Sequence, residues 1–128
     1  MNDSSPRPDS PADVIVVGGG PIGLATAIHA ALAGLTAQII EPKHGTIDKA
    51  CGEGLMPGAL TALHRIGVDP AGADMRGISY TDGRRYVSAD FSEGLGRGVR
   101  RTELHRCLQN RAETVGIDFV TGSMRTLT

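Results

Sequence analysis

Hydrophobic and glycine-rich segments alternate near the start of the chain in the order expected for a strand, a helix and a second strand. Residues 14–17 form a continuous β-branched run, typical of a strand that is covered on both faces. In the alanine-rich segment that follows, Leu24, Ile28 and Leu32 recur along one helical face. The run 35–40 predicts the second strand. Three such elements within about thirty residues have the size of one βαβ unit.

Four further elements are predicted downstream, and there is no internal repeat. The pair Asp82-Gly83 lies between β-prone flanks and is a strong turn signal, so these flanks predict a hairpin. Thr102 is expected to cap the start of a later amphipathic helix. The predicted elements are a helix over 59–67, the hairpin over 77–91, the amphipathic helix over 101–116 and a strand over 117–120.

The six residues GGGPIG, at positions 18–23, contain the pattern G-x-G-x-x-G between the first strand and the helix. In this pattern Gly18 lets the chain turn sharply, Gly20 lets a diphosphate approach the backbone, and Gly23 lets the helix pack close to the strand. Pro21 suits the first helical position because its missing N–H has no helical partner there. The motif and its flanks therefore predict an α/β, Rossmann-like FAD/NAD(P)-binding fold with a small β-hairpin insertion.

Glu41 ends the second predicted strand, 18 residues beyond Gly23. A carboxylate at this offset accepts hydrogen bonds from the ribose hydroxyls of an adenosine, and it repels a 2′-phosphate. The site is therefore expected to favour FAD or NAD over NADP. The alternative is a glycine-rich turn in a βαβ unit that binds no ligand.

Composition narrows the classes of function. With 128 residues, a net charge of −1, two Tyr, two Phe and no Trp, the chain is not expected to bind nucleic acid. Two distant cysteines without metal-site spacing, and no secretory leader or transmembrane run, predict a cytoplasmic protein with free thiols and no metal. The four histidines are expected at surface or boundary positions without catalytic partners. Residues 1–12, which contain three prolines, are expected to be a flexible tail.

Three segments resemble known flavoproteins. Residues 13–34, followed by IIEP, look like the FAD-binding segment at the amino terminus of flavoprotein oxidoreductases. The segments DKACGEGLMPGAL (48–60) and GVRRTELHRCLQNRAETVGIDFVTG (98–122) resemble the superfamily of aromatic hydroxylases and geranylgeranyl reductases. The element CGEG is similar to the cysteine-glycine segment of the geranylgeranyl-reductase-like members. This resemblance identifies residues 13–128 as an FAD-binding domain that is incomplete relative to the family.

The resemblance implies that the first βαβ unit binds the AMP half of an extended FAD. The N–H groups around the glycine motif would face the diphosphate, and the acid at the end of the second strand would hold the ribose. Arg101, before the amphipathic helix, matches the flavin-contacting arginine of the family. Arg100 is the alternative if the match is shifted by one residue. The cofactor-binding residues expected on this basis are Gly18, Gly20, Pro21, Ile22, Gly23, Glu41 and Arg101, with Arg100 as the alternative.

The resemblance also implies an enzyme in which flavin takes hydride from NAD(P)H and then oxidises or reduces a small organic substrate. No catalytic residue is assigned, and the oligomeric state is not predicted. Family members are longer, with a substrate domain and a later Gly-Asp element, so this chain alone is not expected to be active. Two alternatives remain: the NAD-binding domain of a dehydrogenase, and a truncated remnant without catalytic function.

Overall fold

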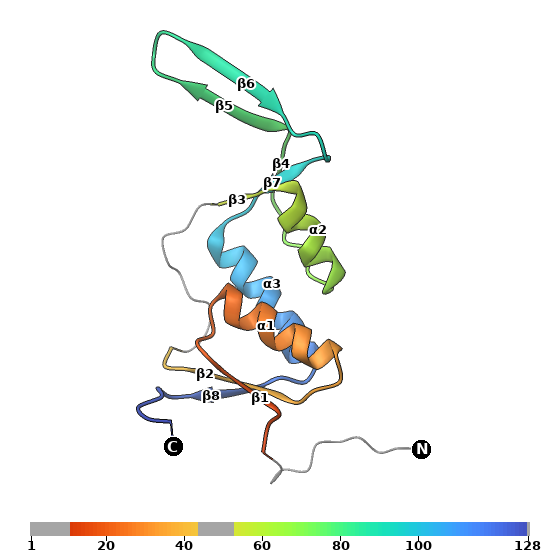
Figure 1. Ribbon diagram of the computed structural model, residues 1–128, viewed down its shortest axis with the longest axis vertical. Helices are drawn as coiled ribbons and strands as arrows, with labels where there is room; N and C mark the ends of the chain where they lie inside the picture. The colour runs from red at the N-terminus through yellow and green to blue at the C-terminus, as the bar shows by residue number, and fades with distance from the viewer. Residues whose placement is uncertain (1–10, 44–52, 128) are drawn as a thin grey trace. The chain divides into compact units, whose positions relative to one another are not determined.

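The structure is a computed structural model that describes residues 11–43 and 53–127 (Figure 1). The chain divides into two compact units. The first unit comprises Met1–Ile47 and Leu108–Thr128, and the second comprises Asp48–Cys107. Within the described residues, no helix is long and apolar enough to cross a bilayer.

The first unit contains the βαβ arrangement that the hydrophobic pattern predicts. Its elements are β1 (Val14–Val17), α1 (Pro21–Leu32), β2 (Ala37–Glu41) and β8 (Asp118–Thr121). The three strands are parallel and follow the order β1-β2-β8. This parallel sheet, with helices packed on it, confirms the α/β Rossmann-like class.

The helix α1 packs on one face of this sheet through a narrow apolar stripe. Leu24, Ala27 and Ile28 of α1 are fully buried, as is Ile39 at the centre of β2. Leu32, which the sequence places on the same helical face as Leu24 and Ile28, is the last residue of α1 and is 49% exposed. Ala27 belongs to the stripe, which shifts the centre of the buried face and leaves Leu32 at its edge.

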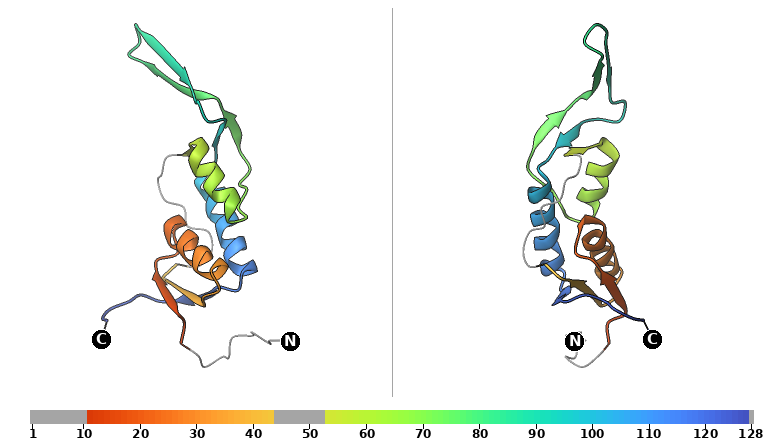
Figure 2. Two further views of the ribbon diagram at one scale, coloured as in Figure 1. Left: turned by 45° about the vertical axis from the view of Figure 1, so that its right-hand side comes forward. Right: turned by 90° about the vertical axis from the view of Figure 1, so that its left-hand side faces the viewer.

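No described helix or strand covers the opposite face of the same sheet (Figure 2). Both views in Figure 2 place α1 and the end of α3 on one side of the strands. Ile15 and Val17, which point to the other side, are 53% and 55% exposed. The prediction that β1 is covered on both faces is therefore wrong for the described residues. A β-branched run does not itself specify whether the second face is covered.

The second unit is built from short antiparallel strands and helices. The strands β3 (Gly54–Leu55), β7 (Gly96–Gly98) and β4 (Ala73–Met75) form one sheet in that order. The helix α2 (Pro57–Arg65) follows β3. The buried apolar core of the second unit includes Leu60, Ile66, Val68 and Val99. The helix predicted over 59–67 is thus present, and it begins two residues earlier because Pro57 occupies its first turn.

The predicted hairpin is also present in this unit. It pairs β5 (Gly77–Thr81) with β6 (Tyr86–Asp90) in antiparallel register. In the turn, Oδ1 of Asp82 accepts hydrogen bonds from the backbone N–H groups of Arg85 at 2.7 Å and Arg84 at 2.8 Å. These bonds hold the pKa of the Asp82 carboxyl below its ordinary value. Gly83 takes a φ of +90°, which L side chains rarely adopt.

The helix α3 (Arg101–Thr114) begins in the second unit and ends in the first. The predicted strand after it is observed as β8, shifted by one residue. The expectation that Thr102 caps this helix is wrong, because Thr102 lies inside the first turn. The carbonyl of Arg100 already accepts the N–H of Leu104 at 3.0 Å, so Arg100 occupies the capping position.

Gly23 sets the distance between α1 and β1. A Cβ placed on Gly23 would collide with the carbonyl oxygen of Gly18 and would lie 3.1 Å from Cγ1 of Val16. Neither the backbone oxygen nor the Val16 side chain can move aside without separating the helix from the sheet. The close helix-strand contact expected for the last glycine of the motif is therefore present.

We expect Gly23→Ala to lower the free energy of unfolding by about 1–3 kcal/mol, because the added methyl group forces α1 away from β1. Urea denaturation of the purified chain measures this change. The matched control is Gly58→Ala in α2, since a Cβ at Gly58 meets no atom within 4 Å. That substitution should stabilise the chain slightly. Equal unfolding midpoints for the two variants would contradict the packing role of Gly23.

Candidate functional site

The turn between β1 and α1 takes a conformation that depends on glycine at its first position. Gly18 has a φ of +109°, and its N–H donates to the carbonyl of Ile40 at 2.8 Å. Gly20, by contrast, has an ordinary extended backbone, with φ −75° and ψ 178°. A Cβ on Gly20 would meet nothing within 4 Å. The absence of a side chain at Gly20 is thus not required by the fold, and it leaves open space beside the backbone.

The start of α1 offers hydrogen-bond donors to an anion. Gly20 is the N-cap and makes no side-chain capping bond, Pro21 begins the helix, and the first turn holds no acidic residue. The N–H groups of a first turn have no partner within their own helix, and the helix dipole adds positive potential there. Uncapped donors in this setting favour phosphate or carboxylate groups.

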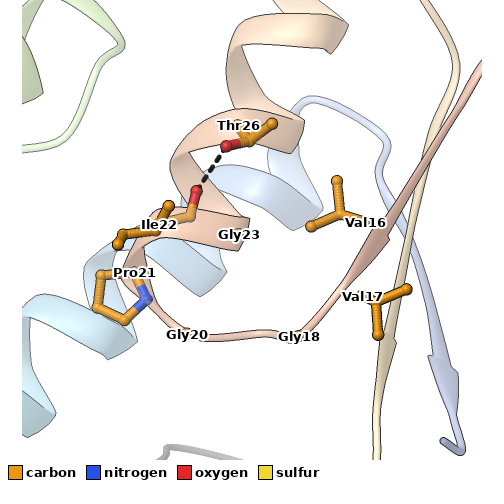
Figure 3. Close-up of a pocket in the computed structure, with 8 residues that line it drawn as sticks. All are labelled: Val16, Val17, Gly18, Gly20, Pro21, Ile22, Gly23 and Thr26. Atoms are coloured by element: carbon orange, nitrogen blue, oxygen red, sulfur yellow. Dashed lines mark hydrogen bonds between the residues drawn. The ribbon is translucent and has the colours of Figure 1, made fainter. Parts of the chain in front are cut away.

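A pocket of about 380 Å³ lies against this turn (Figure 3). Its wall consists of glycine backbone and small apolar side chains, so donors at its edge come from the main chain. Thr26, the hydroxyl-bearing residue of the wall, donates its Oγ1 hydrogen to the carbonyl of Ile22 at 2.8 Å. The lining residues are Val16, Val17, Gly18, Gly20, Pro21, Ile22, Gly23 and Thr26. The open space and the uncapped helix start fit the diphosphate of a dinucleotide.

Glu41 lies at the end of β2, and its carboxylate reaches the glycine turn. Oε2 accepts the backbone N–H of Gly19 at 2.7 Å, and Oε1 accepts that of Lys43 at 3.3 Å. The structure therefore brings Glu41 together with the glycine motif through a contact that the sequence did not predict. Sequence reasoning missed Gly19, although a third glycine between the two motif positions was a visible signal.

The two candidate arginines belong to the second unit, at the start of α3. Arg100 is exposed, whereas Arg101 is partly buried. The buried Nε of Arg101 has no hydrogen-bond partner among the described residues. A buried donor of this kind costs free energy unless a partner satisfies it. Burial thus distinguishes Arg101 from its neighbour, which the sequence alone left as an alternative.

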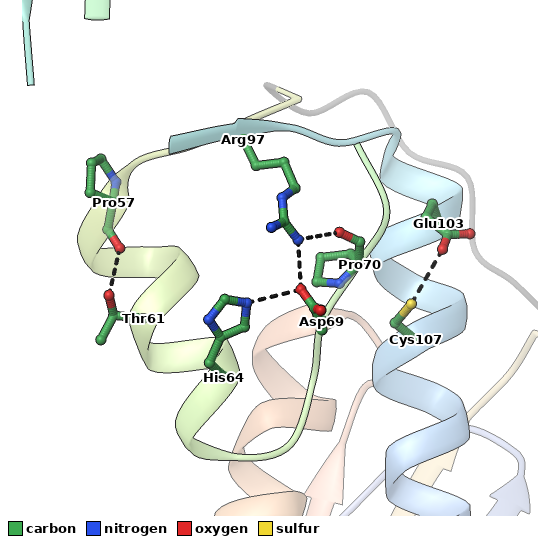
Figure 4. Close-up of polar contacts among 8 residues, drawn as sticks. All are labelled: Pro57, Thr61, His64, Asp69, Pro70, Arg97, Glu103 and Cys107. Atoms are coloured by element: carbon green, nitrogen blue, oxygen red, sulfur yellow. Dashed lines mark hydrogen bonds and ion pairs between the residues drawn. The ribbon is translucent and has the colours of Figure 1, made fainter. Parts of the chain in front are cut away.

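One histidine has a charged partner that the sequence did not predict. Nε2 of His64 lies 2.9 Å from Oδ1 of Asp69, and Nη1 of Arg97 donates to the same oxygen at 2.6 Å (Figure 4). The bond from Arg97, followed by that from His64, holds the pKa of the Asp69 carboxyl below its ordinary value. The expectation that His105 lies at a surface or boundary position is wrong, because this residue is buried, with 2% exposure.

Cys107 is the cysteine that the structure describes, and it is not activated. Its Sγ donates to Oε1 of Glu103 at 3.4 Å, and burial, followed by this bond, raises the pKa of the thiol. The Glu103 carboxyl has a pKa of about 2, mainly because it accepts hydrogen bonds from Arg106. Cys51 and Gly52 of the CGEG segment lie outside the described residues. No group of three or more potential metal ligands occurs within residues 11–43 and 53–127.

Comparisons with known proteins agree with this geometry. The menaquinone reductase of Mycobacterium tuberculosis (strain H37Rv) is 35% identical over 122 residues, covering 90% of this chain and 30% of that protein. A 3-(3-hydroxy-phenyl)propionate/3-hydroxycinnamic acid hydroxylase of Mycobacterium sp. (strain JLS) is 32% identical, covering 72% of this chain and 17% of that protein. The chain thus spans less than a third of the length of these relatives.

A similar fold is found in a geranylgeranyl bacteriochlorophyll reductase-like protein of Thermoplasma acidophilum. It superimposes with a TM-score of 0.71 at 30% identity, over 84% of this chain and 29% of that one. Residues 11–127 match the FAD binding domain family, which is nearly the whole chain. The chain therefore belongs to the FAD-binding domain family that includes menaquinone-reductase-like and aromatic-hydroxylase-like proteins.

Proposed function

We propose that the chain is the part of a flavin-dependent oxidoreductase that holds the adenylate and diphosphate portion of FAD. The observation that carries this proposal is the open space over Gly20, directly before the uncapped start of α1. Membership of the FAD-binding domain family supports FAD as the occupant. A turn that bound no ligand would have no need to keep Gly20 free of a side chain, because its φ of −75° suits any residue.

Different residues of the chain would bind different parts of FAD. The first N–H groups of α1 donate to the phosphate oxygens, and the missing side chain at Gly20 lets these oxygens reach the backbone. Glu41 accepts from the ribose hydroxyls and repels a 2′-phosphate. Arg101 supplies a guanidinium whose buried Nε is available to an anionic or carbonyl oxygen.

Membership of the family and the proposed cofactor support a reaction class for the complete protein. FAD supplies the capacity to take up hydride, here from NAD(P)H, and to pass electrons to a second acceptor. For the complete protein we favour reduction of a small organic substrate of the quinone or prenyl type. This is the preference because the reductase match covers 90% of the chain and the hydroxylase match 72%. Hydroxylation of an aromatic substrate is the second candidate, which the 32% identity to a hydroxylase supports.

The two candidate reactions differ in their need for oxygen. In the complete protein that carries this segment, a reductase should oxidise NAD(P)H under anaerobic conditions when a quinone is added. A hydroxylase should instead consume one O₂ for each aromatic substrate hydroxylated. Stopped-flow absorbance of the flavin, recorded with and without oxygen, distinguishes them. If the reduced flavin is reoxidised only when oxygen is present, even after quinone has been added, the reductase assignment is contradicted.

We expect the chain to bind FAD and to release it when ADP is added, because the proposed contacts of the glycine turn and of Glu41 are to the adenylate and diphosphate groups, which ADP shares. Fluorescence anisotropy of FAD measures both steps. NADP should compete poorly, since the Glu41 carboxylate repels its 2′-phosphate. Binding of NAD without any binding of FAD would instead support the dehydrogenase alternative.

We expect Gly20→Ala to weaken FAD binding about tenfold or more, because a methyl group keeps the diphosphate away from the backbone donors. The fold should tolerate the change, since a Cβ at Gly20 meets no atom within 4 Å. Gly58→Ala, where a Cβ also meets no atom within 4 Å, is the matched control and should leave FAD affinity unchanged. Unaltered FAD affinity in Gly20→Ala would exclude the proposed diphosphate site.

We expect Arg101→Met to weaken FAD binding about tenfold, the effect of losing one charge-assisted hydrogen bond. The stability of the unliganded chain should not fall, because methionine fills the space of the buried stem without leaving a donor unsatisfied. Arg100→Met tests the alternative register, and it should change neither FAD affinity nor stability. A larger effect of Arg100→Met on FAD affinity would transfer the role to Arg100.

A further inference from the structure

Two consecutive N–H groups of the glycine turn donate to the end of β2. The N–H of Gly18 donates to the backbone carbonyl of Ile40 at 2.8 Å. The next N–H, that of Gly19, donates to Oε2 of Glu41 at 2.7 Å. The side chain of Glu41 thus extends the hydrogen bonding of the sheet by one residue, into the turn that precedes α1.

Gly19 is buried, so water is a poor substitute for the carboxylate as a hydrogen-bond acceptor. A Cβ on Gly19 would lie 3.1 Å from Cβ and 3.2 Å from Cγ of Glu41, so the glutamate stem packs directly against the turn. Removing the carboxylate takes away the acceptor of a short hydrogen bond to a buried donor. The turn would then gain other conformations in which its N–H groups no longer converge.

We propose that Glu41 is a positioning residue for the glycine turn, holding Gly19 so that Gly20 and the start of α1 keep their anion-binding arrangement before a ligand arrives. This role is separate from the ribose contact, and only the identity of the ligand rests on the proposed function. The two roles are compatible in one side chain. A carboxylate has about four acceptor sites, and the N–H groups of Gly19 and Lys43 occupy two of them.

The positioning role and electrostatic repulsion predict opposite changes in diphosphate affinity when Glu41 is removed. A carboxylate close to a diphosphate repels it, so removal of Glu41 should strengthen diphosphate binding if charge alone mattered. If Glu41 orders the turn, its removal should weaken diphosphate binding, even for a ligand without ribose hydroxyls. Glu41→Gln separates the two effects, because it removes the charge and keeps an oxygen acceptor for Gly19.

The first measurement is amide hydrogen exchange of Gly19 by NMR in the unliganded, ¹⁵N-labelled chain. Glu41→Ala should accelerate exchange at Gly19 about tenfold or more, while Glu41→Gln stays within about threefold of the unaltered chain. Exchange at Ile39, whose side chain is fully buried in the sheet, reports global opening and should not change. Glu113→Ala, which removes an exposed carboxylate from α3, is the matched control. Equal Gly19 rates in Glu41→Ala and the unaltered chain would overturn the proposal.

The second measurement is calorimetric titration with 2′,3′-dideoxy-ADP, which lacks both ribose hydroxyls. Glu41→Ala should weaken its binding about tenfold, and Glu41→Gln should bind it at least as tightly as the unaltered chain. Tighter binding by Glu41→Ala would show that Glu41 acts through charge alone and would overturn the proposal. If Glu41→Ala does not fold, Glu41→Asp replaces it, because its side chain is one methylene shorter and keeps the negative charge. Weaker binding of the nucleotide by Glu41→Asp would then support the positioning role, and unchanged binding would overturn it. If the unaltered chain binds neither this nucleotide nor FAD, the proposed function fails, and the exchange rates alone decide the positioning role.

Discussion

The close approach of α1 to β1 is the constraint on which the rest of the first unit depends. At Gly23 the helix lies so near the strand that a single methyl group would collide with the carbonyl oxygen of Gly18. This contact fixes where the helix begins, and therefore where its unpaired N–H groups lie. It also brings Leu24 and Ile28 down onto the sheet, where they are fully buried. The packing of the helix and the placement of its first N–H groups thus have one common cause.

The hydrogen-bond donors that the glycine turn offers to a ligand belong to the main chain rather than to side chains. Main-chain donors have little conformational freedom once both ends of the turn are fixed, so little ordering remains to oppose ligand binding. One end is fixed by the sheet, through the bond from Gly18 to Ile40. The other end is fixed by the helix that starts at Pro21. Glu41 acts between these two anchors, where it accepts the N–H of the buried Gly19.

Features with local causes could be predicted from the sequence. The turn at Asp82-Gly83 follows from residues that satisfy their own backbone, because Asp82 accepts the N–H groups of Arg84 and Arg85. The βαβ order follows from hydrophobic periodicity and from the glycine motif. The dinucleotide-type turn was predictable for the same reason, since its pattern lies within six consecutive residues.

Features that depend on contacts across the chain could not be predicted in this way. The bond from Gly19 to Glu41 joins residues 22 positions apart, and the pair Asp69–Arg97 joins residues 28 apart. Burial of His105 and of Arg101 Nε depends on what packs around the start of α3, which hydrophobic periodicity does not describe. The exposure of Leu32 follows from the placement of the buried stripe, which the small Ala27 shifts without a strong hydrophobic signal.

The face of the parallel sheet that no described residue covers has a consequence for the behaviour of the chain in solution. Register aligns Val17 with Ile40 and Ile40 with Val120, so three apolar side chains from neighbouring strands form one row across that face. Covering apolar surface yields about 25 cal/mol per Å². Any surface that covers this row therefore gains free energy, whether it comes from another segment of polypeptide, a chaperone or an identical molecule. The yield of monomer should accordingly fall as protein concentration rises, unless the row is shielded.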